Sequence, residues 1–207
     1  MPGSKAKSRG KSAKRAAILE AARRIFLESG CAAASMDAIA LAAKVSKATL
    51  YAHFTSKDEL FGSMMKARCE EEGLGPVPPE IAALPPKEGL EIIALRYHEF
   101  LVSADAVGVF RLTMAEAPRQ PTLGRAFYEA GPERAFKAVA DYLDVLKSRK
   151  LVNIEDSRLA AEQFLGLVRG SLHLKALLNL GGKPAAAEQK RHAKATAAMF
   201  LAAYGSR

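Results

Sequence analysis

The sequence predicts an all-α protein of about nine helices. Apolar residues recur at intervals of three and four along most of the 207-residue chain, and no stretch alternates between apolar and polar residues as a half-buried strand does. Alanine, the residue with the highest helix propensity, is abundant. Most prolines and glycines lie between the periodic stretches, where they end helices. A hydrophobic content of 49% is ample for a core built from these helices.

The first 15 residues are strongly basic and nearly free of large apolar side chains. They hold six lysines and arginines and no acidic residue. A segment of this composition cannot bury enough apolar surface to fold alone, so we expect residues 1–15 to form a basic flexible arm. Such an arm is either a solvated tail or an extension that follows the phosphates of a nucleic acid.

An amphipathic helix is expected next. Its apolar residues have the i, i+3, i+4, i+7 and i+8 spacing of a single helix face, and they are Ile18, Ala21, Ala22, Ile25 and Phe26. Gly30 is the expected stop, because glycine readily adopts the left-handed conformation that ends many helices.

The following stretch predicts two short helices joined by a tight turn. Ser35 is placed to cap the first of them, and Ser46 the second, Lys47–Phe54. Leu50 and Phe54, four residues apart, are expected to face inward. The residues left to face outward are short, polar or basic, and they are Lys47, Ala48, Thr49, Tyr51 and His53. A capped helix with such a surface suits the major groove of DNA.

The rest of the chain predicts helices separated by proline and glycine. A capping box at Ser56–Glu59 begins a fourth helix, and the proline- and glycine-rich run 73–89 interrupts the pattern. The further helical stretches are 90–103, 107–117, 122–150 with an interruption at Gly131-Pro132, 155–180 and 184–204.

The charge of the chain is uneven. The formal net charge is +9, and residues 1–60 carry 11 lysines and arginines against 5 acidic residues, whereas the remainder carries 20 against 17. The excess therefore lies over the predicted helix-turn-helix, which favours a polyanionic partner such as DNA.

The sequence contains no motif typical of several other classes of protein. The two cysteines, Cys31 and Cys69, are far apart and belong to no cluster with metal-ligand spacing. We find no apolar run typical of a signal peptide or a transmembrane helix, and no phosphate-binding glycine loop or nucleophile motif. We expect a cytoplasmic protein that is not an enzyme and that needs no metal or cofactor.

The run from Ile18 to Phe61 resembles the DNA-binding domain of TetR-family (AcrR-type) transcriptional regulators. The matching positions are Ile39, Ala40, Ala43, Val45, Ser46, Leu50, Tyr51, His53, Phe54, Ser56, Lys57 and Leu60. Lys44 departs from the pattern, because the family usually has glycine in this turn; a positive φ there costs another residue about 1 kcal/mol or more. The stretch from Phe110 to Gly131 also resembles the regulatory half of one branch of the family.

The resemblance implies a domain order and a function. We expect the arm at 1–15, a three-helix DNA-binding domain with the helix-turn-helix at 16–62, and a helical ligand-binding and dimerisation domain at 63–207. The expected function is that of a dimeric repressor released from a pseudo-palindromic operator by a small molecule. The expected DNA-binding residues are Ser35, Ser46, Lys47, Ala48, Thr49, Tyr51, His53 and Lys57.

Within that set we expect Lys47, Ala48 and Thr49 to reach base edges, and Tyr51, His53 and Lys57 to hold phosphates. In the family, the last two long helices pair across a two-fold axis, and here these helices are unusually apolar. The expected ligand pocket combines aromatic and polar residues of otherwise apolar helices: Tyr97, His98, Phe110, Arg111, Met114, Phe127, Arg169 and His173.

Two alternatives are weighed against this hypothesis. A non-specific basic DNA-binding protein would show a steep salt dependence and little sequence discrimination. A helical small-molecule carrier or enzyme would show ligand binding or turnover without DNA binding.

Overall fold

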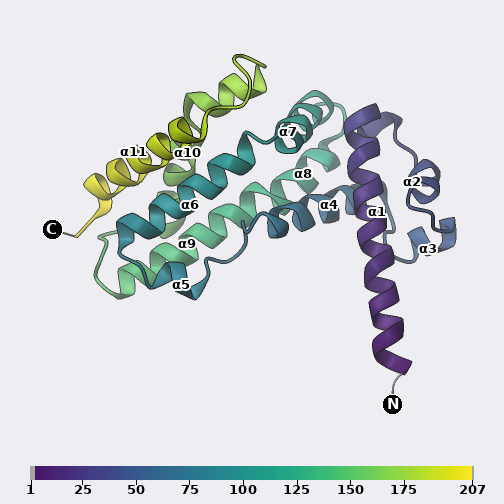
Figure 1. Ribbon diagram of the computed structural model, residues 1–207, viewed down its shortest axis with the longest axis horizontal. Helices are drawn as coiled ribbons and strands as arrows, with labels where there is room; N and C mark the ends of the chain where they lie inside the picture. The colour runs from purple at the N-terminus through teal and green to yellow at the C-terminus, as the bar shows by residue number, and fades with distance from the viewer. Residues whose placement is uncertain (1–2, 207) are drawn as a thin grey trace. The chain divides into compact units, whose positions relative to one another are not determined.

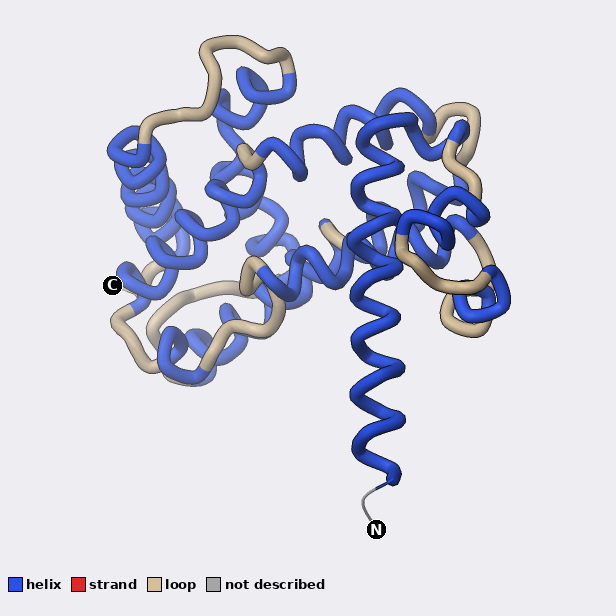
Figure 2. Tube along the Cα trace, turned by 45° about the vertical axis from the view of Figure 1, so that its right-hand side comes forward, coloured by secondary structure: helices blue, strands red, loops and turns tan. Residues whose placement is uncertain are grey.

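All the residues that the structure describes lie in helices or in the loops between them. The computed structural model describes residues 3–206, with side chains from residue 10 onward. Eleven helices are present in this part of the chain, which has no strand (Figures 1 and 2). Their bounds are α1 Gly3–Ala33, α2 Met36–Ala42, α3 Lys47–Tyr51, α4 Lys57–Glu71, α5 Pro79–Ala82, α6 Pro86–Leu101, α7 Ala104–Glu116, α8 Pro121–Ala130, α9 Pro132–Ser148, α10 Ser157–Leu177 and α11 Ala186–Tyr204.

The predicted all-α class is confirmed. The count exceeds the expected nine because α5 is a separate single turn and because Gly131 divides the predicted stretch 122–150 into α8 and α9. None of the helices within the described residues is both long enough and apolar enough to cross a membrane.

Helix α1 begins earlier than the predicted arm allows. Its backbone is helical from Gly3 onward, whereas Met1 and Pro2 lie outside the described residues. Alanine, lysine and arginine are good helix formers and no proline lies between Pro2 and Gly30, so helix propensity outweighs the lack of apolar surface here. The helix breaks at Gly30, whose φ of 81° and ψ of 161° confirm the predicted stop.

The chain divides into two compact units, each with its own core. The N-terminal unit comprises the chain up to Arg68 together with Gly108–Ala130, and the C-terminal unit comprises Cys69–Val107 with the chain from Gly131 onward. The sequence suggested one boundary at residue 62. Residues 108–130 instead pack with the N-terminal helices, because Val109 and Leu123 are buried in the N-terminal core.

The core of the N-terminal unit joins α1 to the short helices that follow it. Ile18, Phe26, Leu50 and Phe61 are fully buried there. The rings of Phe26 and Phe61 meet edge to face, with their centroids 5.6 Å apart. These contacts hold α3 in place, because a helix of five residues is not stable alone.

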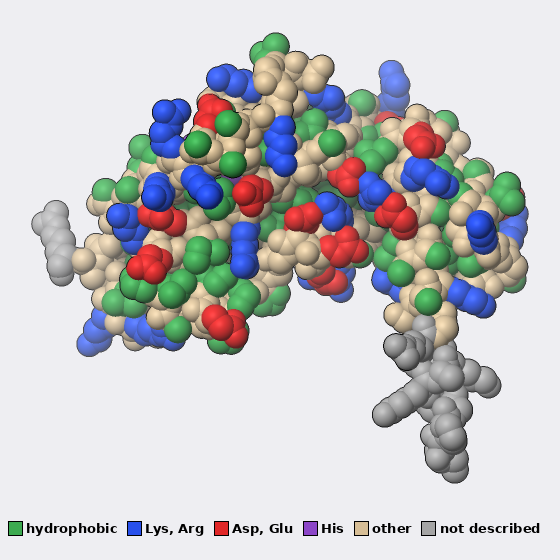
Figure 3. Space-filling view, in the orientation of Figure 1, with side chains coloured by type: hydrophobic (Ala, Val, Ile, Leu, Met, Phe, Trp, Pro, Cys, Tyr) green, Lys and Arg blue, Asp and Glu red, His purple; other side chains and the backbone are tan. Residues whose placement is uncertain are grey.

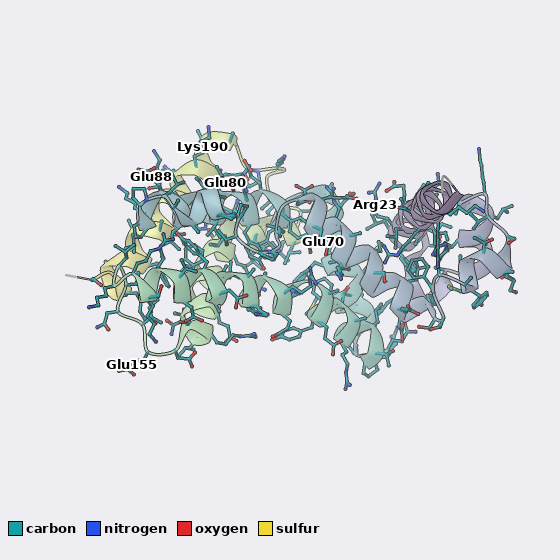
Figure 4. The ribbon with its side chains drawn as sticks, turned by 90° about the horizontal axis from the view of Figure 1, so that it is seen from below. Arg23, Glu70, Glu80, Glu88, Glu155 and Lys190 are labelled. Atoms are coloured by element: carbon teal, nitrogen blue, oxygen red, sulfur yellow. The ribbon has the colours of Figure 1, made fainter. Side chains whose placement is uncertain are left out.

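The core of the C-terminal unit is formed by α6, α9, α10 and α11. Phe164 of α10 and Phe200 of α11 meet edge to face at 5.2 Å. Near its surface, Glu70 at the end of α4 accepts a hydrogen bond of 3.0 Å from Arg134 of α9 (Glu70 is labelled in Figure 4). On the face drawn in Figure 3, basic and acidic side chains are interspersed over this unit.

Candidate nucleic-acid interface

The helix-turn-helix of the N-terminal unit has the predicted caps. The Ser35 hydroxyl accepts a hydrogen bond of 3.1 Å from the backbone N–H of Ala38 and so begins α2. The Ser46 hydroxyl accepts one of 3.1 Å from the N–H of Thr49 and begins α3. Between them Lys44 has a φ of 54°, the left-handed conformation expected where the family usually has glycine.

Helix α3 is shorter than predicted. It ends at Tyr51 rather than at Phe54, because the N–H groups of His53 and Phe54 both turn back to the carbonyl of Leu50. Phe54 is nevertheless buried beside Leu50, so the inward face is the one that the spacing predicted.

The candidate DNA-binding residues are accessible to solvent. Lys47, Ala48 and Tyr51 are exposed, and Thr49 and His53 are partly exposed. Both capping serines are exposed as well. Among the residues with described side chains, none buries Lys47, Ala48 or Tyr51, and such exposure is the condition for α3 to enter a groove.

Besides the capping serines, three of these residues already have protein partners. The Lys47 ammonium donates to the Asp37 carboxylate at 3.0 Å, which joins α3 to α2, and this hydrogen bond raises the pKa of Lys47. The Thr49 hydroxyl lies 2.8 Å from that of Ser46. The Lys57 ammonium donates to the carbonyls of Ala32 and Ala34, at 3.3 and 3.1 Å, which uses two of its three N–H donors.

Basic residues of α1 lie beside this surface. The Arg15 guanidinium stacks over the ring of Phe54, 5.3 Å from its centroid. The pKa of His53 is lowered, first by burial and then by the positive charges of Lys11, Arg15 and Lys14. The sequence placed these three residues in the basic arm and not among the DNA-binding residues, because only the fold brings the first helix beside the end of α3.

The candidate pocket residues divide between the two units. The N-terminal unit holds Phe110, Arg111, Met114 and Phe127. Of these, Arg111 and Met114 are exposed, and the rings of Phe110 and Phe127 meet edge to face at 5.7 Å.

The other four candidates lie in the C-terminal unit, where Tyr97 and His98 of α6 and His173 of α10 are buried. Tyr97 shares a hydrogen bond with Arg169, and burial raises the pKa of its hydroxyl. The eight residues therefore come from both units, and their role in ligand binding stays a prediction.

A small cavity of about 40 Å³ opens in the C-terminal unit. Its lining is mostly apolar, with Arg96 and Tyr97 as the larger polar side chains, and it comprises Gly73, Leu74, Gly75, Val77, Pro78, Ile81, Ile93, Arg96, Tyr97, Ala135, Ala138, Val139 and Leu165. Such a lining with a few polar groups suits a small organic ligand. Of the eight candidate residues, Tyr97 alone belongs to the lining, because no local pattern indicates that the loop 73–78 folds over α6 and α9.

Buried histidines make the C-terminal unit sensitive to acid. Burial, together with the charge of Arg169 and the proximity of His98, lowers the pKa of His173 from 6.5 to about 4. Because the unfolded chain binds this proton more readily, stability is unaffected above pH 6.5 and falls as the pH drops from 6.5 towards 4.

We predict that His173→Gln weakens this loss of stability. Titration of His173 should remove roughly 1–3 kcal/mol between pH 7.5 and pH 4.5, and the variant should lose correspondingly less. Urea unfolding at the two pH values measures the difference. An equal loss in the parent and the variant would assign the acid sensitivity to other groups.

Two family models match the chain. The model of bacterial regulatory proteins of the tetR family matches residues 18–64, and that of the C-terminal domain of AefR-like transcriptional repressors matches residues 88–206. A search of curated proteins found no match.

Similar solved structures cover nearly the whole chain. A TetR-family transcriptional regulator from Mesorhizobium loti is 32% identical, with a TM-score of 0.79, over 94% of this chain and 98% of that one. The flavonoid-responsive regulator FrrA is 39% identical, with a TM-score of 0.76 and the same coverage. A TetR regulator from Agrobacterium tumefaciens is 26% identical, with a TM-score of 0.75, over 94% of this chain and 95% of that one.

Proposed function

Because the chain belongs to the TetR family of transcriptional regulators, we propose that it is a homodimeric repressor which a small aromatic molecule releases from a pseudo-palindromic operator. The observation that carries the proposal is the capped, outward-facing α3 in a basic N-terminal unit. Such a regulator acts on the chromosome, and we place it in the cytoplasm.

Exposed apolar residues of the C-terminal unit support the dimer. Leu159 and Leu167 of α10 lie before its break at Gly170, and Leu174 and the C-cap Leu178 lie after it; each is between 36% and 59% exposed. Met199 of α11 is 62% exposed. A monomer rarely leaves so many large apolar side chains in water, and a two-fold dimer would present two α3 helices to successive major grooves.

The cavity supports an aromatic effector. Arg96 and Tyr97 supply hydrogen-bonding groups for the oxygens of a phenol or flavonoid in an otherwise apolar lining. FrrA, at 39% identity, is described as flavonoid-responsive, which makes this class the first to test.

The proposal is tested by operator binding in the presence and absence of flavonoids. Duplexes that the protein selects from a random library should be bound in preference to competitor DNA, and a flavonoid should release them. Ile93→Trp, which fills the cavity, should keep operator binding and lose release. Equal affinity for selected and competitor duplexes would leave the protein a non-specific DNA binder.

We also predict that Lys11 and Lys14 contribute to the salt dependence of DNA binding. Replacing both with serine should reduce the slope of log K against log salt by about 2 units if each neutralises one phosphate. Lys87 and Lys190 are exposed lysines of the C-terminal unit, and their double replacement removes the same net charge. Fluorescence anisotropy across a salt series measures both slopes, and equal slopes for the two double variants would contradict local contacts by Lys11 and Lys14.

A further inference from the structure

A single turn of chain, residues 31–34, links the break in α1 to the start of α2. The break at Gly30 leaves the first N–H groups of this turn without partners inside the helix. The carboxylate of Glu116 accepts both, with Oε1 at 2.9 Å from the N–H nitrogen of Cys31 and Oε2 at 2.9 Å from that of Ala32. Glu116 is the last residue of α7 and lies 85 residues from Cys31 in the sequence.

The other end of the same turn is also held by a side chain. Lys57, the first residue of α4, donates from its ammonium to the carbonyls of Ala32 and Ala34. A carboxylate thus binds the donors of the turn, and an ammonium binds its acceptors, both through charge-assisted hydrogen bonds. Ser35 follows directly and caps α2.

Gly30 is matched to Glu116 in two ways. Its φ of 81° lies in the region that favours glycine. A Cβ at this position would also lie 2.8 Å from Glu116 Oε1, closer than the carboxylate can tolerate. Two independent properties of Gly30 therefore permit the carboxylate to reach the turn.

We propose that Glu116 is a positioning residue for operator recognition, an inference that rests on the proposed function. The carboxylate fixes the turn, the turn fixes where α2 begins, and the contact between Lys47 and Asp37 joins α2 to α3. Glu116 is half-buried against the turn and acts on α3 through it.

The charge of Glu116 allows a test in which two explanations predict opposite signs. Glu116→Gln removes a negative charge from a protein that binds a polyanion, so long-range electrostatics alone would tighten DNA binding. Loss of the bidentate contact would weaken it, because a carboxamide has one acceptor oxygen and presents an NH₂ group to the second N–H. Glu129→Gln is the matched control, since Glu129 is an exposed glutamate of α8 in the same unit.

The experiment compares the affinities of the parent, Glu116→Gln and Glu129→Gln for a duplex that the parent selects from a random library. We expect Glu116→Gln to bind it roughly tenfold more weakly, the equivalent of one charge-assisted hydrogen bond, and Glu129→Gln to bind it as tightly as the parent or more tightly. Non-specific affinity and the salt slope should be the same in the two variants, since the phosphate contacts are retained.

Three outcomes would overturn the inference. In the first, Glu116→Gln binds as tightly as Glu129→Gln. In the second, its operator affinity falls only in proportion to the unfolded fraction measured by urea titration, which a purely structural role predicts. In the third, the parent itself shows no sequence preference, and the proposed function then fails as well; the first two outcomes, with a selective parent, remove the inference alone.

Discussion

Leu50→Ala is expected to unfold or loosen the N-terminal helices and to remove operator binding. Leu50 is fully buried, and α3 has only five residues, so its position depends on this side chain and on Phe54. Truncation of a buried leucine costs about 2–5 kcal/mol, because apolar surface is lost and a cavity remains. Urea unfolding measures the cost in stability, and anisotropy with the selected duplex measures the loss of binding.

Leu41→Ala is the matched control for this experiment. Leu41 belongs to the neighbouring α2, but its side chain is 81% exposed. The same chemical change should therefore alter stability by no more than about 0.5 kcal/mol. If the two variants lost equal stability, Leu50 would not be the inward anchor of α3. A stable Leu50→Ala protein that kept full operator affinity would show that α3 does not read the DNA.

Gly89→Ala is expected to destabilise the C-terminal unit by roughly 2 kcal/mol or more through overpacking. Gly89 is buried in α6, and a Cβ there would overlap the hydroxyl of Tyr142 and lie 3.2 Å from its Cζ and 3.3 Å from the carbonyl of Ile81. Tyr142 is 2% exposed, so its ring is packed on nearly all sides. The better helix propensity of alanine offsets only about 1 kcal/mol.

A double-mutant cycle isolates this contact. The hydroxyl of Tyr142 is buried without a hydrogen-bond partner among the described residues, and burial raises its pKa to about 12. Tyr142→Phe alone should be neutral or stabilising, and it should restore most of the stability that Gly89→Ala loses.

Gly166→Ala serves as the control for helix propensity. Gly166 lies in α10 with no atom near its would-be Cβ, so alanine should stabilise the protein by about 1 kcal/mol. Urea midpoints for the four variants complete the test. If Gly89→Ala lowered the free energy of unfolding equally in the parent and in Tyr142→Phe, the proposed overlap would be contradicted.

Features set by neighbours in the sequence were predictable. The capping roles of Ser35 and Ser46 and the inward face of Leu50 follow from contacts within four residues. The left-handed turn at Lys44 followed from the resemblance. The predicted start of α1 was wrong. A basic segment without large apolar residues is typical of disorder, but the helix propensity of its alanines, lysines and arginines favours α1.

Features that join distant segments were not predictable from one sequence. Nothing local to Glu116 indicates that its carboxylate meets the N–H groups of Cys31 and Ala32. The spacing of Val109 and Leu123 predicts apolar helix faces but not the core that they join. The cavity also depends on tertiary contacts, because the loop 73–78 lines it together with residues of α6.

The assignment of residues 108–130 to the N-terminal core has a consequence for biosynthesis. A ribosome releases α1–α4 well before Val109, Glu116 and Leu123 emerge, so the nascent DNA-binding segment lacks part of its core while α5 and α6 are being made. Its maturation is therefore coupled to translation of α7 and α8, and a chain terminated at residue 68 would expose apolar surface to chaperones and proteases.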